Sequence, residues 1–192
     1  MDLRIATMDD VPALNSLIAA SARELSAGFY TQRQIEALVT HVFGVDTQLI
    51  SDGTYFVVDG EDAADGPVAA GGWSARRTLY GGDQAKEGED TRLDPSIEAA
   101  RIRAFFVHPR WARRGLGRRL YNECERAALA VGFRNFELMA TLPGEPLYAA
   151  LGFASVERVT VRLPASPIDA SSYVWTGEVV DVPLVKMQRR IV

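Results

Sequence analysis

The segment from residue 97 to residue 141 restricts the fold of this chain more than any other part of it. Residues 97–107 alternate between apolar and other side chains, which predicts a strand, and Pro109 prevents its continuation. A turn rich in glycine and arginine leads into residues 115–131, where apolar residues recur at helical spacing. Residues 133–141 then resume a strand pattern. Strand, helix and strand in this order predict a right-handed crossover, which is typical of mixed α/β folds.

The rest of the chain extends this mixed pattern on both sides. Leu14, Leu17 and Ile18 form the apolar stripe of a first helix, and Thr31 is placed to cap a second helix that ends at Gly44. The further elements that we expect are strands at residues 3–6, 54–58, 68–74, 154–163 and 179–188, a short helix at 145–151, and an exposed polar loop at 81–95. We interpret residues 1–192 as one domain, since this length suits a single core.

Composition argues against several classes of function. The net charge of −4 disfavours general binding of nucleic acids. The single cysteine cannot form an internal disulfide, and His41 and His108 lie too far apart for a metal-ligand motif, so we expect no metal. No apolar run reaches the roughly 20 residues that span a bilayer, and residues 1–4 do not resemble the start of a signal peptide. We therefore expect a cytoplasmic protein that does not bind membranes.

Positive charge is concentrated at the turn before the central helix. Residues 101–119 contain seven arginines and no acidic residue. Gly115 and Gly117 open the helix, where unpaired N–H groups and the helix dipole favour an anion, so the turn predicts a pyrophosphate site. The arginines nearest to this helix start are Arg113, Arg114 and Arg118. The chain lacks the P-loop pattern, and Leu120 stands where a dinucleotide motif needs a third glycine. The alternative is a helix start whose arginines are merely solvated.

Two motifs in this region resemble those of the GNAT superfamily of acyl-CoA N-acyltransferases. The segment Ala112-Arg113-Arg114-Gly115-Leu116-Gly117 is similar to the family's (Gln/Arg)-x-x-Gly-x-(Gly/Ala) motif, although Ala112 replaces the first polar residue. The segment Leu147-Tyr148-Ala149-Ala150-Leu151-Gly152-Phe153 is similar to the family's aromatic-Tyr-x-x-x-Gly-Phe motif, with Leu147 in the place of a phenylalanine. The resemblance implies the GNAT fold: a central twisted mixed sheet of six to seven strands, flanked by about four helices.

This resemblance implies an N-acetyltransferase that uses acetyl-CoA as cosubstrate. In the family, a bulge separates the strand before the pyrophosphate turn from its neighbour, and pantetheine pairs with the exposed backbone at positions that match Phe105 and Val107. The Phe105 amide would polarise the thioester carbonyl as an oxyanion donor, and Tyr148 matches the tyrosine that protonates the departing thiolate. The pyrophosphate would contact Arg113, Arg114, Gly115, Leu116, Gly117 and Arg118.

The general base and the acceptor site stay open at this stage. Arg101 stands where some relatives carry a glutamate, which leaves Glu98 and Glu137 as candidates to accept the proton through water. Such residues are more often solvated strand carboxylates, and an amine of low pKa needs no dedicated base. Aromatic residues in the segments that form the family's acceptor groove would line a pocket, pack in the core or form dimer contacts. These residues are Phe29, Tyr30, Trp73, Tyr80, Tyr173 and Trp175.

Three functions remain in competition. The first is acetylation of a primary amine on a small molecule, the second is acetylation of a protein N-terminus or lysine, and the third is a non-catalytic module that binds acyl-CoA. Tyr148 and the intact glycine turn favour an enzyme. We expect a small-molecule amine acceptor, and a homodimer is left open.

Overall fold

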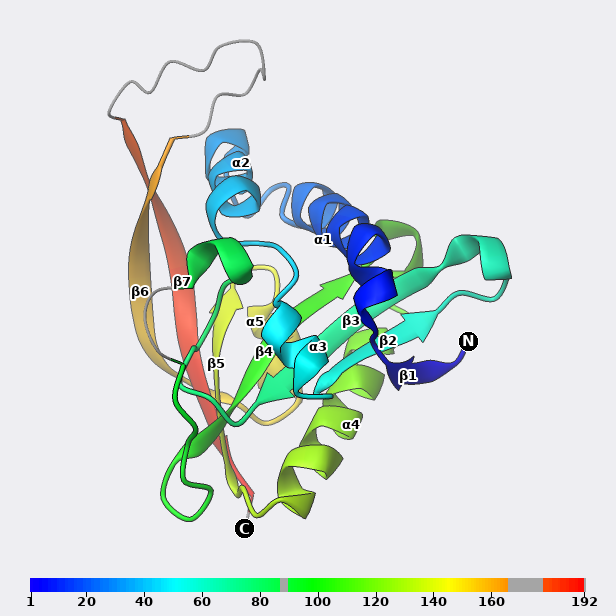
Figure 1. Cartoon of the computed structure of the whole chain (residues 1–192). Coiled ribbons are helices and arrows are strands. Elements are labelled where there is room, and N and C mark those ends of the chain that lie inside the picture. The colour runs from blue at the N-terminus through cyan, green and yellow to red at the C-terminus, as the bar shows by residue number, and fades with distance from the viewer. Residues whose placement is uncertain (87–89, 166–177, 192) are drawn as a thin grey trace.

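A seven-stranded mixed sheet runs through the protein in the order β1-β2-β3-β4-β5-β7-β6 (Figure 1). The computed structural model describes residues 1–86, 90–165 and 178–191. The strands are β1 (Leu3–Ile5), β2 (Tyr55–Asp59), β3 (Pro67–Ser74), β4 (Ala99–Val107), β5 (Asn135–Thr141), β6 (Ala154–Pro164) and β7 (Val179–Arg190). β4 and β5 pair in parallel, whereas the other neighbouring strands pair in antiparallel fashion. The predicted mixed α/β fold is confirmed.

Helices cover both faces of this sheet. The α-helices within the described residues are α1 (Val11–Leu25), α2 (Gln32–His41), α3 (Thr47–Ser51), α4 (Leu116–Ala130) and α5 (Glu145–Ala150). The helix α4 connects β4 to β5 and packs on one face against β2, β3 and β4. The helices α1 and α3 pack on the other face, and α2 lies against β6 and β7 (Figure 1). The described residues therefore contain one more α-helix than the sequence predicted.

Alternating residues of β2 divide the core between these two faces. Phe56 and Val58 belong to the apolar cluster under α4, whereas Tyr55 and Val57 belong to the cluster under α1 and α3. This division follows from strand geometry, because successive side chains point to opposite faces. A third cluster joins α2 to β6 and β7.

Three local predictions differ from the structure. The helix α3 was not predicted, because five residues are too few to show an apolar period. Residues 81–95 are not simply an exposed loop: Leu93 is buried, and its N–H donates to Ala75 O at 2.8 Å. The strand β4 begins at Ala99 rather than at residue 97, because Glu98 N–H donates to Asp94 O at 2.8 Å and closes a turn first.

No helix in the described ranges is long and apolar enough to cross a bilayer.

Candidate active site

A pocket opens where β4 and β5 part. Residues 99–101 of β4 pair with residues 135–137 of β5, and beyond this point the two strands diverge (Figure 1). Residues 102–107 and 139–141 line the pocket that results. The helices α1, α4 and α5 and the segments around residues 42–44 and 79–82 complete its wall. The parting of the two strands thus gives a ligand access to the edge of β4.

A bulge in β4 lies inside this pocket. The register between β3 and β4 shifts so that two residues of β4, Ala104 and Phe105, face the single residue Gly71 of β3. Ala104 has a φ of +54°, which is in the left-handed region that alanine adopts only at an energetic cost. Two positions further on, Val107 N–H donates to Ser21 Oγ of α1 at 3.3 Å. The bulge thus changes which backbone groups of β4 face the pocket.

The N-terminus of α4 forms a cradle beside the same pocket. Arg113 and Gly115 have φ values of +64° and +82°, so the chain turns sharply before α4 begins at Leu116. Gly117 lines the pocket, and a Cβ there would lie 2.8 Å from Cδ2 of Leu147 in α5. The N–H groups of the first helical turn have no partner within the helix, which is the property that binds anions.

The arginines of the predicted basic cluster have two different environments. Five of them, at positions 110, 113, 114, 118 and 119, are exposed around the start of α4. Arg114 places its guanidinium 4.7 Å from the centre of the Trp111 ring. Arg101 and Arg103 instead lie within the sheet and pair with Glu137 and Asp46. Only the first group is available to an anionic ligand.

Tyr148 lines the pocket and contacts the bulge. Its ring meets the Phe105 ring edge to face with centroids 6.1 Å apart, and it meets Phe153 in the same manner at 5.8 Å. Burial raises the pKa of the Tyr148 hydroxyl above its ordinary value of 10. The phenol is therefore protonated at neutral pH, and the structure brings this predicted acid next to the predicted oxyanion donor.

The two carboxylates considered as bases do not line this pocket. Glu98 pairs with Arg77 at 2.9 Å and accepts from Asp94 N–H at 2.8 Å, in the turn before β4. Glu137 is held by Arg101, Lys186 and Gln188 at the point where the strands part.

Burial alone would raise the pKa of Glu137, but hydrogen bonds from Gln188 and Lys186 and the charge of Arg101 bring it below its ordinary value. A carboxylate held in this way is a weak base, and Glu98 lies outside the pocket lining, so we assign the role of base to neither residue.

The predicted acceptor aromatics are distributed between the core and the pocket. Tyr80 lines the pocket together with Leu25, Phe43 and Leu79. Tyr30 is buried instead: its hydroxyl donates to Pro183 O at 2.8 Å and accepts from Leu142 N–H at 2.9 Å. Trp73 is also buried, and Phe29 is exposed away from the pocket lining. Tyr173 and Trp175 lie outside the described residues.

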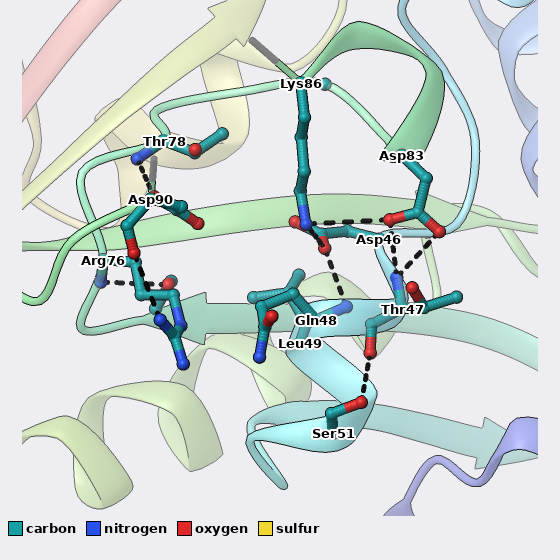
Figure 2. A network of polar contacts seen from close by, with 12 residues as sticks. Asp46, Thr47, Gln48, Leu49, Ser51, Arg76, Thr78, Asp83, Lys86 and Asp90 are labelled. Atoms are coloured by element: carbon teal, nitrogen blue, oxygen red, sulfur yellow. Dashed lines mark hydrogen bonds and ion pairs between the residues drawn. The ribbon is translucent and has the colours of Figure 1, made fainter. Parts of the chain in front are cut away.

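Sequence reasoning missed a polar network that fixes one wall of the pocket. Arg103, itself a lining residue, donates to Asp46 Oδ2 at 2.8 Å and to the carbonyls of Thr78 and Gly81 at 2.7 Å each. Lys86 pairs with the other oxygen of the Asp46 carboxylate, Oδ1 (Figure 2). These contacts fasten the segment around residues 78–86 to the start of α3. The only sequence signal was an arginine between apolar residues of a strand, which must find a partner when buried.

No group of three His, Cys, Asp or Glu that could hold a metal ion occurs within residues 1–86, 90–165 and 178–191.

Comparisons with known proteins identify a common fold. Residues 51–155, more than half of the chain, match a family model described as an acetyltransferase (GNAT) domain. The structure of a GCN5-related N-acetyltransferase from Rhodopseudomonas palustris is similar over 99% of this chain and 95% of that chain, with 18% identity and a TM-score of 0.65. The PaiA N-acetyltransferase from Thermoplasma acidophilum, solved with coenzyme A, is similar over 98% of both chains, with 12% identity and a TM-score of 0.59.

A ribosomal-protein-alanine N-acetyltransferase from Brucella melitensis is similar over 100% of both chains, with 14% identity and a TM-score of 0.58. No curated protein gives a significant sequence match. At these identities the structural similarity shows a shared architecture along the whole chain.

Proposed function

Because the chain belongs to the GNAT family of acetyltransferases and is thus an acyltransferase, we propose that it transfers the acetyl group of acetyl-CoA to a primary amine of a small-molecule acceptor. The observation that carries this proposal is the bulge at Ala104 and Phe105, in the wall of a pocket that also contains Tyr148 and borders the start of α4. One ligand with a pyrophosphate and an extended arm would reach all three features.

The residues present suit coenzyme A. The first turn of α4 and the exposed arginines at 113, 114 and 118 would hold the pyrophosphate. The pantetheine arm would run along the open edge of β4, where Val107 N–H donates to the Ser21 hydroxyl at 3.3 Å. Acetyl-CoA, when bound, supplies an activated thioester carbonyl.

The bulge and Tyr148 would then act on the thioester. We assign to the Phe105 amide the role of hydrogen-bond donor to the thioester carbonyl oxygen. This oxygen gains negative charge when the neutral amine nitrogen attacks the carbonyl carbon. The C–N bond forms and the C–S bond breaks. The departing sulfur takes a proton from the Tyr148 hydroxyl, and Tyr148 then regains a proton from solvent. The amine nitrogen gives up one proton to water. A phenol that stays protonated at neutral pH suits this donor role.

Four apolar and aromatic residues of the pocket lining support a small acceptor. Leu25, Phe43, Leu79 and Tyr80 give the pocket apolar and aromatic walls, which suit a compact amine better than a peptide.

Calorimetry tests the proposed cosubstrate site first. We expect CoA and acetyl-CoA to bind the wild type, and the double variant Arg113→Glu/Arg114→Glu to bind at least about tenfold more weakly. Both side chains are exposed, so the fold should be retained. Arg126→Glu, which changes an exposed arginine near the other end of α4, is the matched control and should bind like the wild type. Equal affinities in all three proteins would refute the site.

Thiol release with a panel of amines and peptides tests the acceptor. Turnover with small amines, and none with peptides of varied N-termini and lysines, is the expected result. Turnover with peptides alone would replace the small-molecule acceptor with a protein. Tight binding of acetyl-CoA without turnover on any acceptor would favour a binding module.

A further inference from the structure

A buried tyrosine two strands away contacts the bulge of β4. Tyr55 of β2 is completely buried, and its hydroxyl donates to Ala104 O at 3.1 Å. To reach that carbonyl its ring passes over β3 at Gly72, where a Cβ would lie 2.8 Å from Tyr55 Cδ2. The same Cβ would lie 2.7 Å from the backbone oxygen of Thr54, so a side chain at position 72 would displace both β2 and the Tyr55 ring that contacts the bulge.

Gly71, the neighbouring residue of β3, leaves space for an aromatic ring on the opposite face of the sheet. At Gly71 a Cβ would lie 2.7 Å from Cδ2 of Phe105. Successive strand residues point to opposite faces, so the two glycines leave room for Tyr55 on the face of α1 and for Phe105 on the face of α4. The Phe105 ring is then held between β3 and the ring of Tyr148. The bulge is supported from both sides of the sheet.

These contacts fix the direction of one peptide group. The peptide between Ala104 and Phe105 is planar and trans, so its C=O and N–H point in opposite directions. The hydrogen bond to Tyr55 holds the carbonyl toward the face of α1, and the Phe105 N–H must therefore point the other way. The left-handed φ of Ala104 is an unfavourable conformation that persists where neighbouring groups hold it.

We propose that Tyr55 is a positioning residue that aims the Phe105 amide at the acyl carbonyl, and that Gly71 and Gly72 are the spaces this arrangement requires. The inference rests on the proposed function, since it assumes that this amide is the oxyanion donor. Burial, followed by the charge of Asp46, raises the pKa of Tyr55, so its hydroxyl remains a hydrogen-bond donor at the pH of any ordinary assay.

Tyr55→Phe tests the proposal because it removes one oxygen and keeps the ring. We expect kcat to fall on the order of tenfold, less than the roughly 10²–10³-fold loss when an oxyanion donor is removed outright. The KM for acetyl-CoA and the affinity for CoA should stay within about twofold, since the cradle at α4 is unchanged. The matched control is Tyr121→Phe: Tyr121 is equally buried and accepts from Arg189 Nη1 at 2.7 Å, but it does not line the pocket. Its kcat should equal that of the wild type.

Infrared spectroscopy of bound acetyl-CoA, labelled with ¹³C at the thioester carbonyl, distinguishes a misdirected Phe105 amide from a general loosening of the fold. In the wild type the carbonyl stretch should shift to lower frequency than in solution, and in Tyr55→Phe it should return toward the free value. A wild-type stretch and a wild-type kcat in Tyr55→Phe would overturn the inference while the proposed function stands. No shift and no turnover in the wild type would refute the proposed function itself, and the inference with it.

Gly71→Ala gives a second test if Tyr55→Phe does not fold. Its added Cβ would lie 2.7 Å from Cδ2 and 2.9 Å from Cγ of Phe105, so it displaces the Phe105 ring and leaves Tyr55 untouched. The same loss of carbonyl shift and of kcat is expected, and wild-type values would overturn the proposal.

Discussion

Replacing Asp46 by asparagine would test whether the pocket wall depends on a buried charge. The carboxylate of Asp46 binds Arg103 at 2.8 Å, and both side chains are only 1% exposed. The same carboxylate also accepts from Lys86 and from the N–H of Gln48 at the start of α3 (Figure 2). Asparagine keeps the shape and the helix cap, since it is as good a cap as aspartate. The substitution therefore removes the charge and replaces Oδ2, which accepts from Arg103, by an amide NH2 that cannot accept a hydrogen bond.

The expected loss of unfolding free energy follows from the Arg103 charge that stays buried without its partner. Breaking a buried ion pair by removing one partner costs about 3–5 kcal/mol, because the other charge stays buried. Arg103 keeps its hydrogen bonds to the Thr78 and Gly81 carbonyls, so we place Asp46→Asn near the lower end, at about 3 kcal/mol. For a chain of this size that loss corresponds to a fall of about 6–12 °C in Tm. Asp46→Ala should lose about 1 kcal/mol more, because the cap disappears as well.

Urea unfolding at pH 7 measures these differences. Glu36→Gln is the control: its partner Arg23 is 48% exposed, and such surface pairs contribute at most about 1 kcal/mol. If Asp46→Asn loses no more than this control, the charge does not hold the wall and the reasoning is wrong.

Three further predictions concern the cosubstrate site and the N-terminal ion pair. Tyr148→Phe should lower kcat in a thiol-release assay and leave CoA affinity unchanged in calorimetry; equal turnover would remove Tyr148 as the acid. Gly117→Glu should abolish CoA binding, because it adds bulk and negative charge beside the cradle; unchanged affinity would contradict the assignment. Hydrogen bonds from Arg4 lower the pKa of Asp10 from 3.8 to about 2, so this pair stabilises the fold above pH 3.8 and the effect is lost as pH falls toward 2. The difference in unfolding free energy between the wild type and Asp10→Asn should shrink over that range, and a constant difference would refute it.

The long elements were predictable from sequence because each carries many periods of its pattern. The central helix, predicted at 115–131, spans Leu116–Ala130, and the final strand, predicted from residue 179, begins at Val179. The parting of β4 from β5 and the bulge followed from family resemblance rather than from composition. Nothing in the local sequence marks residue 104 as left-handed, because the residue there is an alanine.

The contacts that shape the pocket were not predictable, because they join distant segments. Asp46 and Arg103 are 57 positions apart, and the sequence indicates that a buried Arg103 needs a partner without indicating which residue it is. Glu137 looked like a free carboxylate, since its partners Lys186 and Gln188 come from the last strand. Pairing across a sheet decides which charges stay available, and periodicity carries no information about it.

The glycine pair of β3 has a consequence for anyone who engineers this protein. Glycine inside a strand is less stable than alanine by roughly 0.5–1 kcal/mol, so Gly71 and Gly72 are positions where stability-guided design would suggest a substitution. Both are in close contact with the rings that support the bulge. A library selected for heat resistance alone would accept a replacement at Gly71 where the Phe105 ring shifts, and would lose turnover without any visible change at Tyr148 or at the cradle. A Cβ at Gly72 would also lie 2.7 Å from the backbone oxygen of Thr54, so a replacement there displaces β2 as well. Selections for robustness should therefore keep both positions fixed.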